Sequence, residues 1–166
     1  MSGTTVTPHL RDLTGADRGR IEAITRAVGL FREDELAIAL EVFDEAVSGS
    51  AANTYSAMGA ESEGVLSGWI CWGPTPCTLG TYDLYWMAVD PGVQGSGIGT
   101  ALLSEMERRL AGLVRLIVIE TAGRTDYAGT RAFYQARGYS PVAVVPDFYA
   151  PGDDQVVFVK TGGFHG

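Results

Sequence analysis

Four glycines lie between residues 92 and 99, directly before an apolar run with the spacing of a helix. The segment, GVQGSGIGTALL, follows LYWMAVD, which is typical of a buried strand. A helix N-terminus leaves backbone N–H groups unpaired and carries about half a positive charge, so it attracts anions. Gln94, Gly97 and Gly99 form the pattern Q-x-x-G-x-G, in which glycine lets a phosphate approach the backbone closely. The pattern therefore favours a pyrophosphate bound by main-chain amides.

Other interpretations of the same glycines fit less well. A Walker loop needs a lysine followed by Ser or Thr after its last glycine, and Ile98, Gly99 and Thr100 supply no lysine. The Rossmann pattern, GxGxxG, would fall on Gly95, Gly97 and Thr100 and fails at its last position. A turn that serves only to join a strand to a helix is the structural alternative.

The elements that must position this loop follow from the apolar periodicity. Helical spacing predicts helices at 15–28 and 31–49, and a third that continues from the glycine segment to about residue 112. A fourth is expected at 127–137, with Asp126 as its N-cap and Gly138 at its C-terminal end. The expected order is strand, two helices, three strands, helix, strand, helix and two strands. The continuous apolar run YDLYWMAV predicts a central strand covered on both faces.

Composition narrows the function classes. The 166 residues carry a formal charge of −8 and only one lysine, which argues against nucleic acid as a partner. No segment approaches the ~20 apolar residues of a membrane span, and Met1–Leu10 does not resemble a secretion signal. We therefore expect one domain, residues 1–166, in the cytoplasm and without a membrane partner. Cys71 and Cys77 fit neither a redox pair nor a zinc site and are expected to be buried or half-buried free thiols.

Two segments resemble a known family. MAVDPGVQGSGIGTALLSEMERRL resembles the acyl-CoA-binding motif of the GNAT N-acyltransferase superfamily, and RAFYQARGY is similar to that family's late helix, with its tyrosine, glycine and final aromatic residue. The resemblance covers most of the chain in element order. FREDE, GPTP, DLYW and DFYAPGDD further resemble one bacterial subgroup.

The resemblance implies a specific fold. It is an α+β fold, a single GNAT-like domain built on a mixed, mostly antiparallel twisted sheet of about six or seven strands. About four helices flank the sheet, and the fourth and fifth strands are parallel and splayed.

The resemblance also implies acetyl-CoA as co-substrate, with no metal. The amides that would hold its pyrophosphate belong to Gln94, Gly95, Ser96, Gly97, Ile98, Gly99 and Thr100. The pantetheine arm would pair, like an added strand, with Met87, Ala88 and Val89. The family often has an asparagine seven residues before its catalytic tyrosine, where this chain has Tyr127. Thr130 or Arg131 is expected to replace that contact, with Arg131 near a phosphate.

Tyr134 matches the residue that protonates the departing CoA thiolate in the family. A phenol with a pKa of about 10 can protonate the thiolate of a thiol with a pKa of about 8.5, and at neutral pH it still carries its proton before the reaction. The alternative is a tyrosine that only packs on an amphipathic helix.

The acceptor amine must lose a proton before it attacks. For a lysine-like amine this costs roughly 4.6 kcal/mol at pH 7. Asp83 is the first candidate base, because some family members place a carboxylate eleven residues before the loop glutamine, as Asp83 stands before Gln94. Glu120, at the end of the next strand, is the second. A structural carboxylate or a water remains an alternative, and alignment of the reactants could supply much of the rate.

The acceptor is expected between the second helix, the WGPTP connection and the final hairpin. The acidic residues near this region are Glu33, Asp34, Glu35, Asp153 and Asp154. Its expected apolar walls are Phe31, Trp72, Tyr85 and Tyr149. This acidity favours a small amine or a polyamine, although charges at helix starts and turns are often only solvated.

The sequence thus predicts transfer of an acetyl group to a primary amine of a small molecule, with Tyr134 as general acid. The alternatives are acetylation of a peptide N-terminus or lysine, and a non-catalytic acyl-CoA sensor. The resemblance also allows a homodimer.

Overall fold

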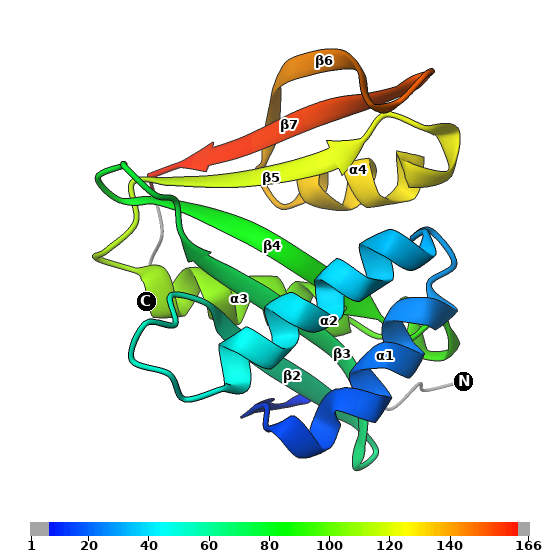
Figure 1. Ribbon diagram of the computed structural model, residues 1–166, viewed down its shortest axis with the longest axis vertical. Coiled ribbons are helices and arrows are strands. Elements are labelled where there is room, and N and C mark those ends of the chain that lie inside the picture. The colour runs from blue at the N-terminus through cyan, green and yellow to red at the C-terminus, as the bar shows by residue number, and fades with distance from the viewer. Residues whose placement is uncertain (1–6, 163–166) are drawn as a thin grey trace.

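Seven strands form one mixed sheet within residues 7–162, the part of the chain that this computed structural model describes (Figure 1). They are β1 (His9–Asp12), β2 (Ser56–Ser62), β3 (Val65–Pro74), β4 (Thr81–Val89), β5 (Leu116–Ala122), β6 (Ser140–Ala150) and β7 (Asp153–Thr161). Their order across the sheet is β1-β2-β3-β4-β5-β7-β6, and only β4 and β5 pair in parallel. This topology confirms the predicted fold class. The leader prediction rests mostly on residues 1–6, which lie outside the described range.

Helices cover both faces of the sheet. They are α1 (Arg18–Ala27), α2 (Glu33–Val47), α3 (Ile98–Leu110) and α4 (Ala128–Ala136). Figure 1 shows α1 and α2 in front of the sheet and α3 behind it. The front core joins Ile24 and Phe43 to Trp69 of β3, whereas the rear core joins Leu102 of α3 to Ile117 of β5. The strand β4 lies between these two cores, as its continuous apolar run predicts.

The two parallel strands separate along their length. Pairing between β4 and β5 covers four residue pairs and ends at Leu84 and Ile119. Beyond this point the strands diverge, as Figure 1 shows. β4 also carries one extra residue, Tyr85, opposite the step from Cys71 to Trp72 in β3, and such a bulge bends a strand. The outer edge of β4 beyond the bulge therefore has no partner strand among the described residues.

The start of α4 differs from the prediction. The chain first forms a 3-10 turn at Thr125–Tyr127, and the α-helix begins only at Ala128. Asp126 does not cap it: its carboxylate accepts a hydrogen bond from Arg124 Nε at 3.1 Å. The predicted N-cap is wrong because the tight first turn moves the helix start past Asp126.

Two predictions about covalent and membrane chemistry can be compared directly with residues 7–162. Both Cys71 and Cys77 are free thiols, as predicted, and Cys71 is buried. The prediction of burial is wrong for Cys77, which is exposed. None of the helices in this range is both long enough and apolar enough to cross a membrane.

Candidate active site

A cavity of about 980 Å³ lies where β4 and β5 diverge. It is bounded by the end of β4, the glycine segment, α4, and residues of the α1–α2 connection, β5, β6 and β7. Most of the predicted site residues line it: Phe31, Glu35, Asp83, Tyr85, Met87, Ala88, Val89, Gln94, Gly95, Gly97, Ile98, Gly99, Thr100, Glu120, Thr130, Tyr134 and Tyr149. The splay therefore brings residues far apart in the sequence to one site.

The glycine segment forms the N-terminus of α3 at one end of this cavity. Gly97 is the N-cap with φ of 86°, and Gly95 has φ of 84°. Such left-handed angles strain any residue with a Cβ, which explains glycine at both positions. The N–H groups of the first helical turn, from Ile98 to Thr100, have no acceptor inside the helix. They can therefore donate to an anion in the cavity.

The free edge of β4 lines the cavity beside this loop. Met87, Ala88 and Val89 pair with β3 on one side, and β5 has already diverged on the other. A backbone edge without a partner can accept an extended, amide-containing chain as an added strand. The geometry agrees with the predicted role of these three residues.

Arg137 is a functional candidate that the sequence did not single out. It lines the cavity, and its Nε donates to Thr100 Oγ1 at 3.0 Å. Its guanidinium carbon lies 3.6 Å from the centre of the Phe133 ring. These contacts hold a permanent positive charge against the first turn of α3. The residue lies one helical turn after Tyr134 in RAFYQARGY, but only the fold brings it next to Thr100.

Tyr134 extends from α4 and is only 4% exposed. Its ring packs at 6.0 Å from Tyr139 and at 6.4 Å from Phe158, and the residue also lines the cavity. Burial raises the pKa of its phenol above the usual value, and nearby Tyr127 adds to this effect. The hydroxyl is therefore protonated at neutral pH and available as a proton donor.

The two candidate bases lie on neighbouring strands. Asp83 pairs with Val118 in the parallel register, so Glu120 lies on the same face, two residues further along β5. The Thr75 hydroxyl donates to Asp83 Oδ2 at 2.7 Å. Glu120 is exposed to the cavity, where partial desolvation raises its pKa and the negative charge of Asp83 raises it further. At a given pH, Glu120 is therefore protonated to a greater extent than an ordinary glutamate.

Carboxylates dominate the charge of the cavity lining. The charged lining residues are Glu35, Asp83, Glu120, Asp126, Asp153 and Arg137. Arg137 lies at the glycine loop, so the remainder of the lining is acidic. Aromatic side chains accompany the acids, and the ring centres of Phe31 and Trp86 lie 5.0 Å apart in a tilted arrangement. Within residues 7–162, no group of three or more His, Cys, Asp or Glu is arranged to hold a metal ion.

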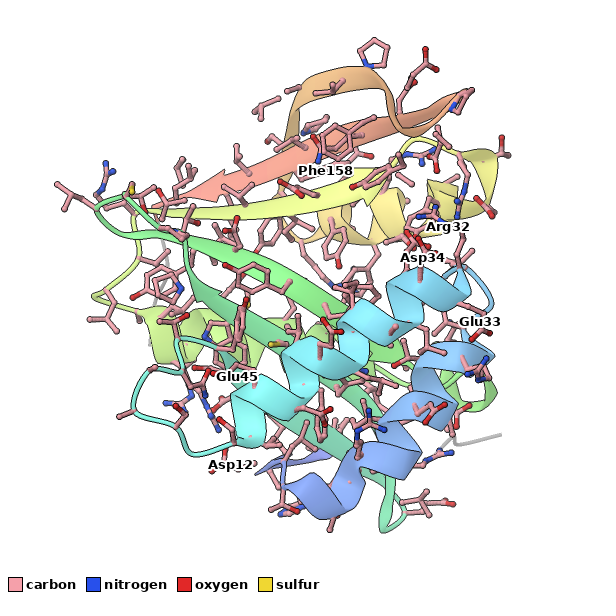
Figure 2. The ribbon with its side chains drawn as sticks, viewed as in Figure 1. Asp12, Arg32, Glu33, Asp34, Glu45 and Phe158 are labelled. Carbon is pink, nitrogen blue, oxygen red and sulfur yellow. The ribbon has the colours of Figure 1, made fainter. Side chains whose placement is uncertain are left out.

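Two residues predicted to bind the acceptor amine do not line this cavity. Trp72 is 3% exposed and packs in the core on the α3 side of the sheet, so the prediction that it forms a wall of this cavity is wrong. The reason is its core, because Trp72 packs in the same cluster as Leu102 and Met106 of α3. Glu33 is labelled in Figure 2 and lies at the start of α2. It forms an ion pair with Arg26 of α1. It is a surface residue at the start of α2 and does not line the cavity.

Three residues predicted to bind acetyl-CoA use the predicted groups for other contacts. The guanidinium of Arg131 donates to the carbonyl oxygens of Ala122 at 2.7 Å and Arg124 at 2.8 Å. This arginine joins α4 to the end of β5 and does not line the cavity. The Ser96 amide donates to the Val93 carbonyl at 3.2 Å and the Gln94 amide to the Pro91 carbonyl at 3.4 Å, so neither is free for a pyrophosphate as predicted. The Ser96 hydroxyl donates to the same Val93 oxygen. Thr130, the other substitute proposed for the missing asparagine, does line the cavity, as does Tyr127.

The fold and this cavity place the protein in a class of acetyl-transferring enzymes. The family model for the acetyltransferase (GNAT) domain matches residues 50–141, more than half of the chain. The protein belongs to the GNAT acetyltransferase family.

Individual relatives agree with this assignment. A crystal structure from Desulfovibrio desulfuricans, assigned to the GNAT acetyltransferase family, is 39% identical, with a TM-score of 0.86, 93% of this chain covered and 99% of that chain. An uncharacterised N-acetyltransferase of Methanocaldococcus jannaschii is 31% identical over 74 residues, which are 45% of this chain and about half (47%) of that protein.

A more distant structure shows the fold alone. It is an N-acetyltransferase from Thermoplasma acidophilum in complex with coenzyme A, 16% identical, with a TM-score of 0.72, 94% of this chain covered and 99% of that chain.

Proposed function

We propose that the protein transfers an acetyl group from acetyl-CoA to a primary amine of a small cationic molecule. The observation that carries this proposal is one continuous cavity with two chemically different parts. One part has the helix N-terminus and the free strand edge, and the other is lined with carboxylates. Tyr134 lines the same cavity, so donor, acceptor and proton donor can meet there.

The donor would be held mainly by backbone groups. The amides of the first turn of α3 would bind the pyrophosphate, and the edge at Met87, Ala88 and Val89 would pair with pantetheine. Arg137 would add a charged hydrogen bond to a phosphate oxygen. This arrangement suits an acidic protein, because little of the binding depends on lysine or arginine.

The reaction would be a direct attack. The neutral amine nitrogen forms a bond to the thioester carbonyl carbon, and the carbon–sulfur bond breaks. The Tyr134 hydroxyl gives its proton to the departing thiolate, and a carboxylate takes a proton from the amine. Of the two candidates, Glu120 suits this role better, because Asp83 is held by Thr75 and its charge makes Glu120 more basic.

A thiol-release assay tests the function directly. Acetyl-CoA is incubated with amino acids, polyamines, aminoglycosides and peptides, and free CoA is measured. We expect small amines with net positive charge to give the highest kcat/KM. Preference for peptides would favour acetylation of a protein, and tight acetyl-CoA binding without thiol release from any acceptor would favour a sensor.

Arg137→Ala should raise the KM for acetyl-CoA about 10- to 100-fold, since a hydrogen bond to a charged group contributes about 1.5–3 kcal/mol. The kcat should change little, because the residue would contact the donor far from the reacting thioester. The measurement is steady-state kinetics at saturating acceptor. Arg108→Ala is the matched control, because Arg108 is exposed on α3 and pairs with Glu105. Equal effects of the two substitutions would contradict the assignment.

Asp83→Asn should move the acidic limb of the kcat/KM profile to lower pH. A base must be deprotonated, so activity falls as the pH drops through the pKa of Glu120. Desolvation is the larger cause of the raised pKa of Glu120, and the charge of Asp83 is the second. Removal of the Asp83 charge therefore lowers the pKa of Glu120. The profiles of both proteins are measured with one acceptor, so that the acceptor's own titration cancels. Complete loss of activity in Asp83→Asn would instead identify Asp83 as the base.

A further inference from the structure

The carboxylate of Asp153 is buried with one oxygen unsatisfied. The residue is 6% exposed and lines the acidic part of the cavity. Its Oδ2 accepts a hydrogen bond from Arg124 at 3.2 Å, whereas Oδ1 has no hydrogen-bond partner in the described part of the chain. A buried carboxylate oxygen without a donor is costly, so it marks a position where a ligand N–H would be stabilised.

Arg124 holds this carboxylate from outside the cavity. Its Nη2 donates to the Leu30 carbonyl at 3.0 Å, and it also pairs with Asp126. Arg124 is not part of the cavity lining. The arginine therefore holds Asp153 through Oδ2 and leaves Oδ1 without a donor.

Glu35 supplies a second carboxylate at the same end. Its Oε2 accepts the backbone N–H of Arg32 at 2.8 Å, and its Oε1 lies 3.8 Å from the guanidinium of the same arginine. These contacts fix Glu35 in the first turn of α2. Burial raises the pKa of Tyr127 to about 12, and the charge of Glu35 adds to the shift. Burial also raises the pKa of Tyr149, on which both Glu35 and Asp153 act. All four residues line the same cavity, so the two carboxylates and the two phenol rings form one cluster.

This cluster is separate from the pair of candidate bases. Asp83 and Glu120 come from β4 and β5, whereas Glu35 and Asp153 come from α2 and β7. Glu120 acts on the Tyr149 phenol as well, so Tyr149 lies near both acidic groups. An apolar wall of Phe31 and Trp86 accompanies them in the lining. The lining therefore offers two anionic positions joined by aromatic surface.

We propose that the acceptor is a linear aliphatic diamine or polyamine that binds both acidic groups. One terminal amine reacts beside Glu120, and a second, protonated amine binds Asp153 Oδ1 and Glu35. The rings of Tyr127 and Tyr149 stabilise that ammonium through cation–π attraction. This inference rests on the proposed function and adds the class of its substrate.

The test compares α,ω-diaminoalkanes with n-alkylamines of the same carbon number. The diamine should have the lower KM by about 10- to 100-fold, because only it forms the second charged hydrogen bond. Asp153→Asn and Glu35→Gln should each remove most of this advantage by raising the KM of the diamine. The KM of the monoamine should stay constant. Glu33→Gln is the matched control, because Glu33 lies on the same helical turn outside the cavity.

The outcomes separate this inference from the proposed function. Equal kcat/KM for mono- and diamines, or equal losses for both in the variants, would overturn the second binding position while acetyl transfer stands. Thiol release from no amine at all would refute the function itself. Retained acetyl-CoA affinity shows that a variant is folded. Glu35→Gln keeps the test decisive if Asp153→Asn disturbs the contact with Arg124.

Discussion

Tyr134→Phe should lower kcat by about 100- to 10,000-fold, the usual contribution of a general acid or base. The substitution removes only the hydroxyl, so the ring can keep its contacts with Tyr139 and Phe158. The thiolate would then leave without a proton from the enzyme. The affinity for acetyl-CoA should remain within about twofold, because the lost group acts in the transition state. Stopped-flow or steady-state thiol release measures kcat, and calorimetry measures the affinity.

Tyr139→Phe is the control for this experiment. Tyr139 is also a buried tyrosine of the same core, but its hydroxyl donates to Glu107 at 2.9 Å and it does not line the cavity. We expect it to reduce stability and to leave kcat nearly unchanged. Similar kcat values for wild type and Tyr134→Phe would exclude proton transfer by Tyr134 and leave it a packing residue.

Gly97→Glu should weaken acetyl-CoA binding by at least about 100-fold, since it acts through two separate effects. The φ of 86° strains any side chain at this position. The new carboxylate would also place negative charge at the helix N-terminus, where the pyrophosphate is expected. Calorimetric titration with acetyl-CoA gives the change in Kd.

Two further variants separate strain from charge. Gly97→Ala introduces the strain without the charge and should have the smaller effect on Kd. Gly49→Glu introduces both the backbone strain and the negative charge at a distant position. Gly49 has φ of 68°, and an added Cβ would meet no atom within 4 Å. This substitution should lower stability and leave acetyl-CoA binding intact. Unchanged binding in Gly97→Glu would mean that the loop does not hold the donor.

Local signals were sufficient to propose the acetyl-CoA-binding part of the site. A glycine-rich helix start and a strand end are defined by neighbours in sequence, so Gln94, Gly97 and the strand edge could be assigned before the fold was known. The same holds for Tyr134, which the motif itself marks. Their placement in one cavity supports these assignments, and their roles stay proposals.

The acceptor part was harder to predict because it depends on register and long-range contacts. A strand residue faces one side or the other according to pairing, and the bulge at Tyr85 changes the register just where Trp72 pairs. Arg131 satisfies backbone carbonyls that only the folded connection presents. Arg137 depends on Thr100, which lies 37 residues earlier in the chain. The homodimer and the cytoplasmic location remain predictions.

The divergence of β4 and β5 divides the molecule into parts that can evolve at different rates. The groups proposed to bind the donor come from the end of β4, the glycine loop and one end of α4. The acidic cluster comes from α2, β6, β7 and the 3-10 turn before α4. Substitutions in these outer elements can change which amine is accepted without changing the groups proposed to bind acetyl-CoA. A lineage with this architecture can therefore acquire new acceptors without losing its acyl source.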